Sequence, residues 1–241
     1  KTSSRMFEFV FKMFGEGMAV IPLGGIEEIS KQLTAKLNKT VFKLNTEVTS
    51  VKDREVVLST GEKLISDATI IATDVNKLVK NLQRQGLEWK SCQTLYFKSK
   101  KRAIVKPFIG LIPNNKSLIN NIFYHTSLQT SNTSKEELLS VTVVKDHNLL
   151  EKELVATVLQ QLEEECNIQA LTFLKFYTIS KALPALENLK YEVSPSETQL
   201  TATVFLAGDV QLNGSLNAAM IAGENAALAV LERLGRNTTT V

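Results

Sequence analysis

The alternation of apolar and polar positions divides the chain into helical and extended segments. From Ile26 to Leu37, apolar residues recur every three or four positions, which is the spacing of one face of a helix. The charged segment from Glu151 to Glu165 has the same spacing, and the segment from Ser4 to Phe14 is apolar on most of its sides. A run of small residues from Leu216 to Leu234 and a short segment from Val75 to Leu82 complete the predicted helices.

Short runs rich in β-branched and aromatic residues predict strands in three parts of the chain. Turn residues at Asp53-Arg54 and Thr60-Gly61 favour hairpins, so we expect a small antiparallel meander that leads to a strand ending at Ala72-Thr73. Helices combined with a mixed set of strands predict an α+β fold. The predicted strands cover residues 41–44, 47–51, 55–58, 63–66, 68–72, 93–97, 108–112, 118–124, 138–144 and 173–179, with a last one that begins at Val204.

The order of these elements indicates a discontinuous domain. Residues 40–74 and 200–235 carry the short buried strands of a nucleotide-type fold, whereas residues 75–199 alternate strands with one amphipathic helix. We therefore predict that residues 75–199 form an inserted domain and that residues 1–39 are a helical lead-in belonging to it. The apolar helix at Ser4 to Phe14 is then either buried against another part of the protein or free to meet a lipid or partner surface.

The segment from Val204 to Ser215 carries the most informative chemistry. A buried strand stops at Gly208-Asp209, where a carboxylate can accept hydrogen bonds from a sugar or polyol hydroxyl and a glycine lets a ligand approach the backbone. The helix that follows presents free amide groups and the positive end of its dipole, which suits a phosphate or the electron-rich edge of a reduced flavin. The same residues also fit a plain turn and N-cap between a strand and a helix, and they leave both interpretations open.

Composition and charge exclude several classes of function. The 28 basic and 25 acidic residues give a formal net charge of +3, which is too balanced to predict nucleic-acid binding. Cys92, Cys166, His125 and His147 show no metal-ligand spacing, so no metal is expected. We interpret the basic run at 98–102 as a solvated turn. The two distant cysteines favour a reducing, cytoplasmic compartment, and no apolar run reaches the roughly 20 residues of a membrane-spanning helix.

The chain resembles the flavin-containing amine oxidase superfamily, above all its phytoene desaturase-like members. The order and spacing of three segments carry the resemblance. They are Gly17–Ile26 with the helix after it, residues 43–48 followed by Thr60-Gly61 and 70–73, and Phe205-Leu-Ala-Gly-Asp209 followed by 213–219 and 223–227.

This resemblance implies an FAD-dependent oxidoreductase. It implies that Val48 meets the adenine through its backbone, and that Ala72 and Thr73 lie near the nucleotide. Gly208 and Asp209 would contact the ribityl–pyrophosphate region. The helix start, which comprises Gly214, Ser215 and Leu216, would face the isoalloxazine.

The resemblance also implies roles for the predicted domains. Residues 40–74 and 200–235 would be part of an FAD-binding domain, and residues 75–199 a substrate-binding domain. An apolar substrate of the polyene or isoprenoid type would be dehydrogenated by hydride transfer to the flavin. The sequence identifies no catalytic residue.

One family segment has no counterpart in this sequence, namely the amino-terminal strand, Gly-x-Gly-x-x-Gly turn and helix. The chain also begins at Lys1 without an initiator methionine. We therefore expect the carboxy-terminal portion of a longer protein, inactive without the missing FAD-binding segment. Two alternatives stay open: a flavin-free lipid- or prenyl-binding scaffold, as in Rab GDP-dissociation inhibitors, and an amine oxidase. Peripheral contact with a membrane and a homodimer also stay open.

Overall fold

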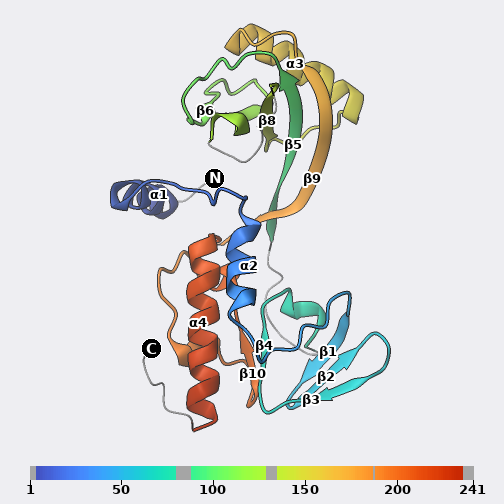
Figure 1. The fold of residues 1–241 in the computed structure, drawn as a ribbon, viewed down its shortest axis with the longest axis vertical. Coiled ribbons are helices and arrows are strands. Elements are labelled where there is room, and N and C mark those ends of the chain that lie inside the picture. The colour runs from blue at the N-terminus through green and yellow to red at the C-terminus, as the bar shows by residue number, and fades with distance from the viewer. Residues whose placement is uncertain (1–3, 80–87, 129–134, 187, 236–241) are drawn as a thin grey trace. The chain divides into compact units, whose positions relative to one another are not determined.

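A computed structural model describes residues 4–79, 88–128, 135–186 and 188–235, and its helices and mixed sheets confirm the predicted α+β class. No helix among these residues is long and apolar enough to cross a membrane. The chain divides into two compact units (Figure 1). The first consists of Lys1–Gly17, Lys39–Glu88 and Pro184–Val241, and the second of Met18–Asn38 and Trp89–Leu183. Both segments of the second unit are therefore inserted, along the sequence, into the first.

The first unit contains the predicted antiparallel meander. Strands β1 (Val48–Lys52), β2 (Glu55–Leu58) and β3 (Lys63–Ile65) form a sheet in that order. The hairpin between β1 and β2 closes at Asp53-Arg54, where Arg54 has a left-handed φ of 62°. The turn residues Asp53-Arg54 and Thr60-Gly61 therefore predicted both hairpins correctly.

A separate parallel pair joins β4 (Thr69–Ile71) to β10 (Val204–Leu206). The ladder continues at both ends, because Thr69 N–H donates to the Thr203 carbonyl at 2.8 Å and Ala207 N–H donates to the Ile71 carbonyl at 2.9 Å. Every residue of β10 is buried, as expected of a strand covered on both faces. The two strands therefore end side by side at the same edge of the pair.

The two faces of β10 contact different partners. Val204 and Leu206 pack with Val51 of β1 and Ile71 of β4, whereas Phe205 packs against the long helix α4 (Leu216–Arg233). The face of α4 that is buried consists only of alanines, which lets the helix approach the strand closely. These alanines are Ala218, Ala222, Ala226 and Ala229.

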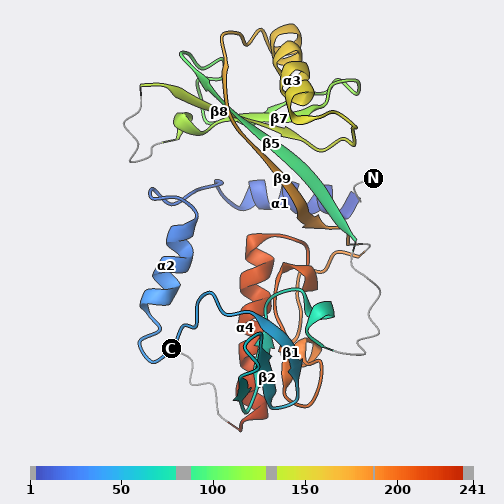
Figure 2. The ribbon, with the colours of Figure 1, turned by 90° about the vertical axis from the view of Figure 1, so that its right-hand side faces the viewer.

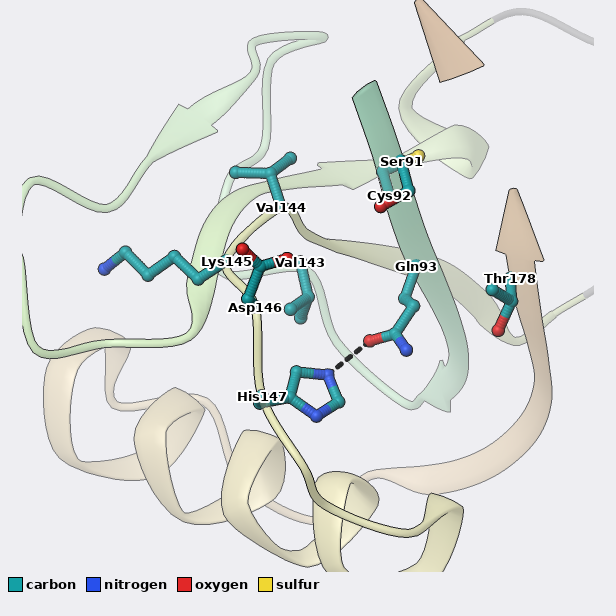
Figure 3. A pocket seen from close by; sticks show the side chains of 9 residues that line it. All are labelled: Ser91, Cys92, Gln93, Val143, Val144, Lys145, Asp146, His147 and Thr178. Carbon is teal, nitrogen blue, oxygen red and sulfur yellow. Dashed lines mark hydrogen bonds between the residues drawn. The ribbon is translucent and has the colours of Figure 1, made fainter. Parts of the chain in front are cut away.

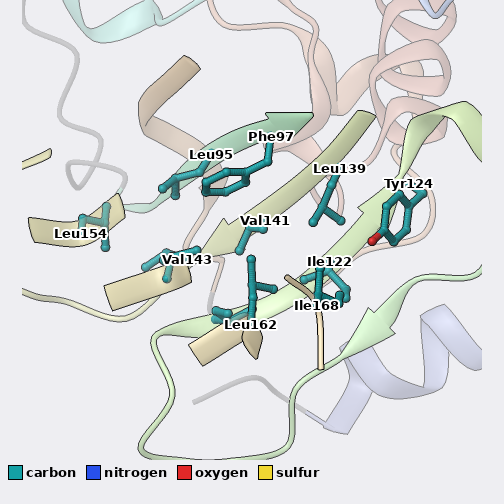
Figure 4. Close-up of a cluster of buried hydrophobic side chains, with 12 residues drawn as sticks. Leu95, Phe97, Ile122, Tyr124, Leu139, Val141, Val143, Leu154, Leu162 and Ile168 are labelled. Carbon is teal, nitrogen blue, oxygen red and sulfur yellow. The ribbon is translucent and has the colours of Figure 1, made fainter. Parts of the chain in front are cut away.

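The second unit is a five-stranded sheet with strand order β6-β7-β8-β5-β9. Helix α3 (Glu151–Cys166) lies on one face of the sheet (Figure 2) and buries Leu154, Val158 and Leu162. Figure 4 shows the resulting core, in which these helix residues meet the inward side chains of the strands. The strands are β5 (Trp89–Ser99), β6 (Gly110–Leu111), β7 (Ile119–Tyr124), β8 (Glu137–Val143) and β9 (Thr172–Pro184).

The two remaining helices are α1 (Ser4–Glu16) in the first unit and α2 (Glu27–Ala35) in the second. Neither contains a buried residue. In α1, Phe9 meets Tyr191 with ring centroids 5.8 Å apart, while Phe7, Phe11 and Phe14 are about 70% exposed. Phe7 and Phe11 stack on each other at the surface.

Three predicted elements differ from the structure. Residues 41–44 form no strand, because Val41 and Leu44 are exposed and the chain turns at Asn45, whose φ is 53°. The predicted helix at 75–82 is a single 3₁₀ turn at Val75–Lys77, capped by Asp74, and residues 80–82 lie outside the described part. Strand β9 continues through Pro184 instead of ending before Ala182.

Candidate functional site

Four of the predicted cofactor residues lie where the parallel strands of the first unit end. Ala72 and Thr73 directly follow β4, and Gly208 and Asp209 follow β10 one residue later. The hydrogen bond from Ala207 N–H to the Ile71 carbonyl holds the two exits together. The carboxyl edge of neighbouring parallel strands is the usual place for a ligand in an α/β arrangement, so the structure puts these four residues in one candidate site.

Gly208 has a backbone conformation that only glycine adopts readily. Its φ of 120° and ψ of 161° lie in a region that a Cβ makes strained. Apart from the two neighbouring residues of the chain, nothing lies within 4 Å of the place where a Cβ would stand, so the space beside this glycine is open. The backbone here can therefore be approached closely from outside.

Asp209 begins a 3₁₀ turn, Asp209–Gln211, immediately after this glycine. Its carbonyl accepts the amides of Leu212 at 3.0 Å and Gly214 at 3.2 Å, which closes the turn. Its carboxylate, in contrast, accepts no hydrogen bond from any residue that the structure describes. The side chain is half-buried and keeps its capacity to accept hydrogen bonds from a ligand.

A buried asparagine and a serine fix the start of α4. The Ser215 hydroxyl accepts the amide of Ala218 at 3.1 Å, which is an N-cap bond, and donates to Asn213 Oδ1 at 2.7 Å. The Asn213 side-chain amide in turn donates to the Lys190 carbonyl at 3.2 Å. The loop from Asp209 to the helix is therefore held by its own hydrogen bonds, and the Ser215 side chain is already engaged.

The amides of Leu216 and Asn217 remain free at the start of α4. Ala218 N–H is capped by Ser215 and Ala219 N–H donates to the Ser215 carbonyl at 3.0 Å, but the two earlier amides donate to no described residue. Both residues are exposed. With the positive end of the helix dipole, they can attract a negatively charged or electron-rich group.

Val48, the first residue of β1, packs against the cluster that contains Ile71 and Leu206, which are the last residues of β4 and β10. The start of β1 thus lies against the strands that lead into the candidate site. The structure brings all eight predicted residues into the first unit: Val48, Ala72, Thr73, Gly208, Asp209, Gly214, Ser215 and Leu216.

A model of one protein family matches this sequence over almost its full length. Residues 2–231 match the family model described as flavin containing amine oxidoreductase. The chain belongs to this family. No curated protein matches it.

Several solved structures of oxidoreductases share the fold of this family member. Putrescine oxidase bound to putrescine aligns with a TM-score of 0.59 and 12% identity, over 88% of this chain and 53% of its own. A candidate protoporphyrinogen oxidase from Exiguobacterium sp. 255-15 aligns with a TM-score of 0.61 and 17% identity, over 88% and 51%. An oxidoreductase from Methanosarcina mazei aligns with a TM-score of 0.57 and 11% identity, over 88% and 54%. This chain therefore spans about half the length of the structures that it resembles.

Two side chains that hold the loops and strands near the candidate site were not identified from the sequence. Asn213 had the pattern of a turn residue, but it is buried and links two loops. Asp53 had the pattern of a hairpin turn, but its Oδ1 accepts the Thr201 hydroxyl at 2.6 Å and the amide and hydroxyl of Thr203 at 2.8 Å. The Thr201 and Thr203 hydroxyls, with the Thr203 amide, hold the pKa of Asp53 below its usual value.

The inserted unit contains a small polar cavity of about 100 Å³, shown in Figure 3. In its wall, His147 Nδ1 accepts the Leu149 amide at 3.2 Å, so the ring proton lies on Nε2 and is donated to the Gln93 side-chain oxygen. Cys92 lines the same cavity. Over the described residues, no group of three or more His, Cys, Asp or Glu side chains could hold a metal ion.

Proposed function

We propose that the chain supplies one wall of the cofactor site and the substrate-binding domain of an FAD-dependent oxidoreductase. The observation that carries this proposal is the convergence of two parallel strand ends, a free Asp209 carboxylate and the free amides at the start of α4. Membership of the flavin containing amine oxidoreductase family supports a flavin as the ligand. The chain covers about half the length of the structures that it resembles, so the oxidoreductase activity of a whole protein is part of this proposal.

The residues present suit a dinucleotide with a polyol chain. An unpartnered carboxylate at Asp209 can accept hydrogen bonds from ribityl or ribose hydroxyls, and the open space beside Gly208 admits the ligand to the backbone. The free amides of Leu216 and Asn217 suit the electron-rich edge of an isoalloxazine. Gly214 and Ser215 would contribute shape rather than donors, because the Gly214 amide and the Ser215 hydroxyl already bind within the loop.

The other predicted residues take roles on the nucleotide side. Val48 would meet the adenine through its backbone, and Ala72 and Thr73, both exposed at the end of β4, would lie along the nucleotide. When bound, the flavin would accept the hydride that a dehydrogenated substrate loses. The residues of this chain would orient the flavin and stabilise negative charge at its edge.

The second unit is proposed as the substrate domain. An apolar substrate, of the polyene or isoprenoid type, is the first candidate. A primary or secondary amine is the second candidate, and it is favoured by the structural similarity to putrescine oxidase. A protein in which a Gly-x-Gly-x-x-Gly segment precedes this chain distinguishes the two candidates, when its turnover of amines and of polyenes is compared under the same conditions.

Flavin content is the direct test of the proposal. The 241-residue chain alone is expected to lose FAD during gel filtration and to be inactive, because it lacks the glycine-rich turn that holds the pyrophosphate. A longer protein in which a strand and a Gly-x-Gly-x-x-Gly turn precede the chain is expected to retain one FAD per polypeptide. A longer protein of this kind that folds but never binds flavin, and instead co-purifies with lipid, would contradict the proposal and favour the scaffold function.

A further inference from the structure

A second cavity of about 360 Å³ is lined only by residues of the inserted unit, and none of them is proposed to bind flavin. One wall is the basic turn after β5, from Ser99 to Ala103, and the other is the turn after α3, from Asn167 to Ala170. Tyr124, the last residue of β7, completes the lining. The volume falls within the range of small-molecule sites.

The basic turn leaves two positive charges uncompensated. Arg102 is paired with Glu137 at 3.1 Å, but the side chains of Lys100 and Lys101 have no partner among the described residues. Both lysines are exposed and belong to the cavity lining. The opposing turn follows the last turn of α3, where the carbonyls of Glu163 and Leu162 accept the amides of Asn167 and Ile168 at 3.0 Å.

Tyr124 adds a polar group to the cavity that is independent of the two lysines. The side chain is 1% exposed, packs in the main core of the unit beside Ile168 (Figure 4), and its hydroxyl has no hydrogen-bond partner. Burial raises the pKa of Tyr124, so the phenol keeps its proton at neutral pH. The Ala103 backbone lowers this pKa, against the effect of burial, but it makes no hydrogen bond to the hydroxyl.

We propose that this cavity binds a small phosphate ester. Two lysine ammonium groups and a phenolic hydroxyl are three separate donors, which suits an oxyanion with several peripheral oxygens. The phosphate would lie between Lys100, Lys101 and the Tyr124 hydroxyl. The ester carbon skeleton would cover the apolar wall that Ile168, Ala103 and Ala170 provide.

The test is a calorimetric titration of the full 241-residue chain with phenyl phosphate. Saturable binding of one molecule per chain is expected, with inorganic phosphate binding more weakly because it leaves the apolar wall uncovered. The double variant Lys100→Gln/Lys101→Gln is expected to lower the affinity by about tenfold or more. The matched control Lys116→Gln/Lys152→Gln removes the same charge from exposed lysines outside the cavity and is expected to change the affinity less than about twofold.

Tyr124→Phe separates binding from folding. It removes a hydroxyl that has no partner, so the thermal stability of the free protein is expected to stay the same or rise, while the affinity for phenyl phosphate falls several-fold. Absence of saturable binding, equal losses in the two double lysine variants, equal affinity for inorganic phosphate, or unchanged affinity in Tyr124→Phe would each overturn the proposal.

Discussion

Asp53 offers the sharpest test of how the first unit is held together. One oxygen of its carboxylate accepts three hydrogen bonds from Thr201 and Thr203, which connect the β1–β2 hairpin to the residues that precede β10. Thr203 is buried, so Asp53→Ala leaves a buried amide and a buried hydroxyl without this acceptor. A buried donor left unsatisfied costs about 1–3 kcal/mol, and because Asp53 itself is exposed, water recovers part of the loss. We expect a loss of about 2 kcal/mol.

Urea denaturation measures this loss. With a slope of about 1–3 kcal/mol per molar urea, the midpoint is expected to fall by about 1 M in Asp53→Ala. Asp53→Asn keeps an oxygen acceptor and should lose less. Asp67→Ala removes an exposed carboxylate that has no partner in the described structure, and serves as the control. Equal midpoints for Asp53→Ala and Asp67→Ala would refute the reasoning.

Three further predictions concern other parts of the chain. Ser215→Ala removes the N-cap of α4 and is expected to cost about 1 kcal/mol in urea denaturation, with recovery in Ser215→Thr, and no recovery would argue against the cap. Leu162→Ala leaves a cavity in the core of the second unit and is expected to lower the free energy of unfolding by about 2–5 kcal/mol. A loss outside this range would contradict the packing described. The Ser194 amide, Lys190 and the Ser194 hydroxyl lower the pKa of Glu197 from 4.5 to about 2. The stability that Glu197 adds to the folded protein is therefore full above the unfolded-state pKa and is lost as the pH falls toward about 2. Acid titrations of wild type and Glu197→Gln should therefore converge across that range.

The sequence predicted the elements whose patterns are local. The alanine face of α4, the Gly208-Asp209 stop after β10 and the meander from β1 to β3 all follow from periodicity and turn residues within one segment. The strand predicted at residues 41–44 was wrong, because a strand requires a partner and none of the described strands pairs with this segment. Periodicity within one segment does not reveal whether a partner exists.

Interactions between distant segments could not be predicted. Asp53 and Thr203 are far apart in the sequence, and Asn213 reaches the carbonyl of Lys190 on another loop. Tyr124 had the pattern of an ordinary core residue, and only its surroundings show that its hydroxyl lacks a partner. Such contacts depend on tertiary placement, for which a single sequence carries no local signal.

The flavin content of Asp209 variants tests the central claim most directly. In a longer protein that contains this chain after a Gly-x-Gly-x-x-Gly segment, the wild type is expected to retain one FAD per polypeptide through gel filtration. Asp209→Ala is expected to lower the affinity for FAD by about tenfold or more, since it removes a carboxylate acceptor for hydroxyl groups, whereas Asp67→Ala should leave it unchanged. Equal FAD retention and affinity in both variants would contradict the placement of the flavin at the ends of β4 and β10.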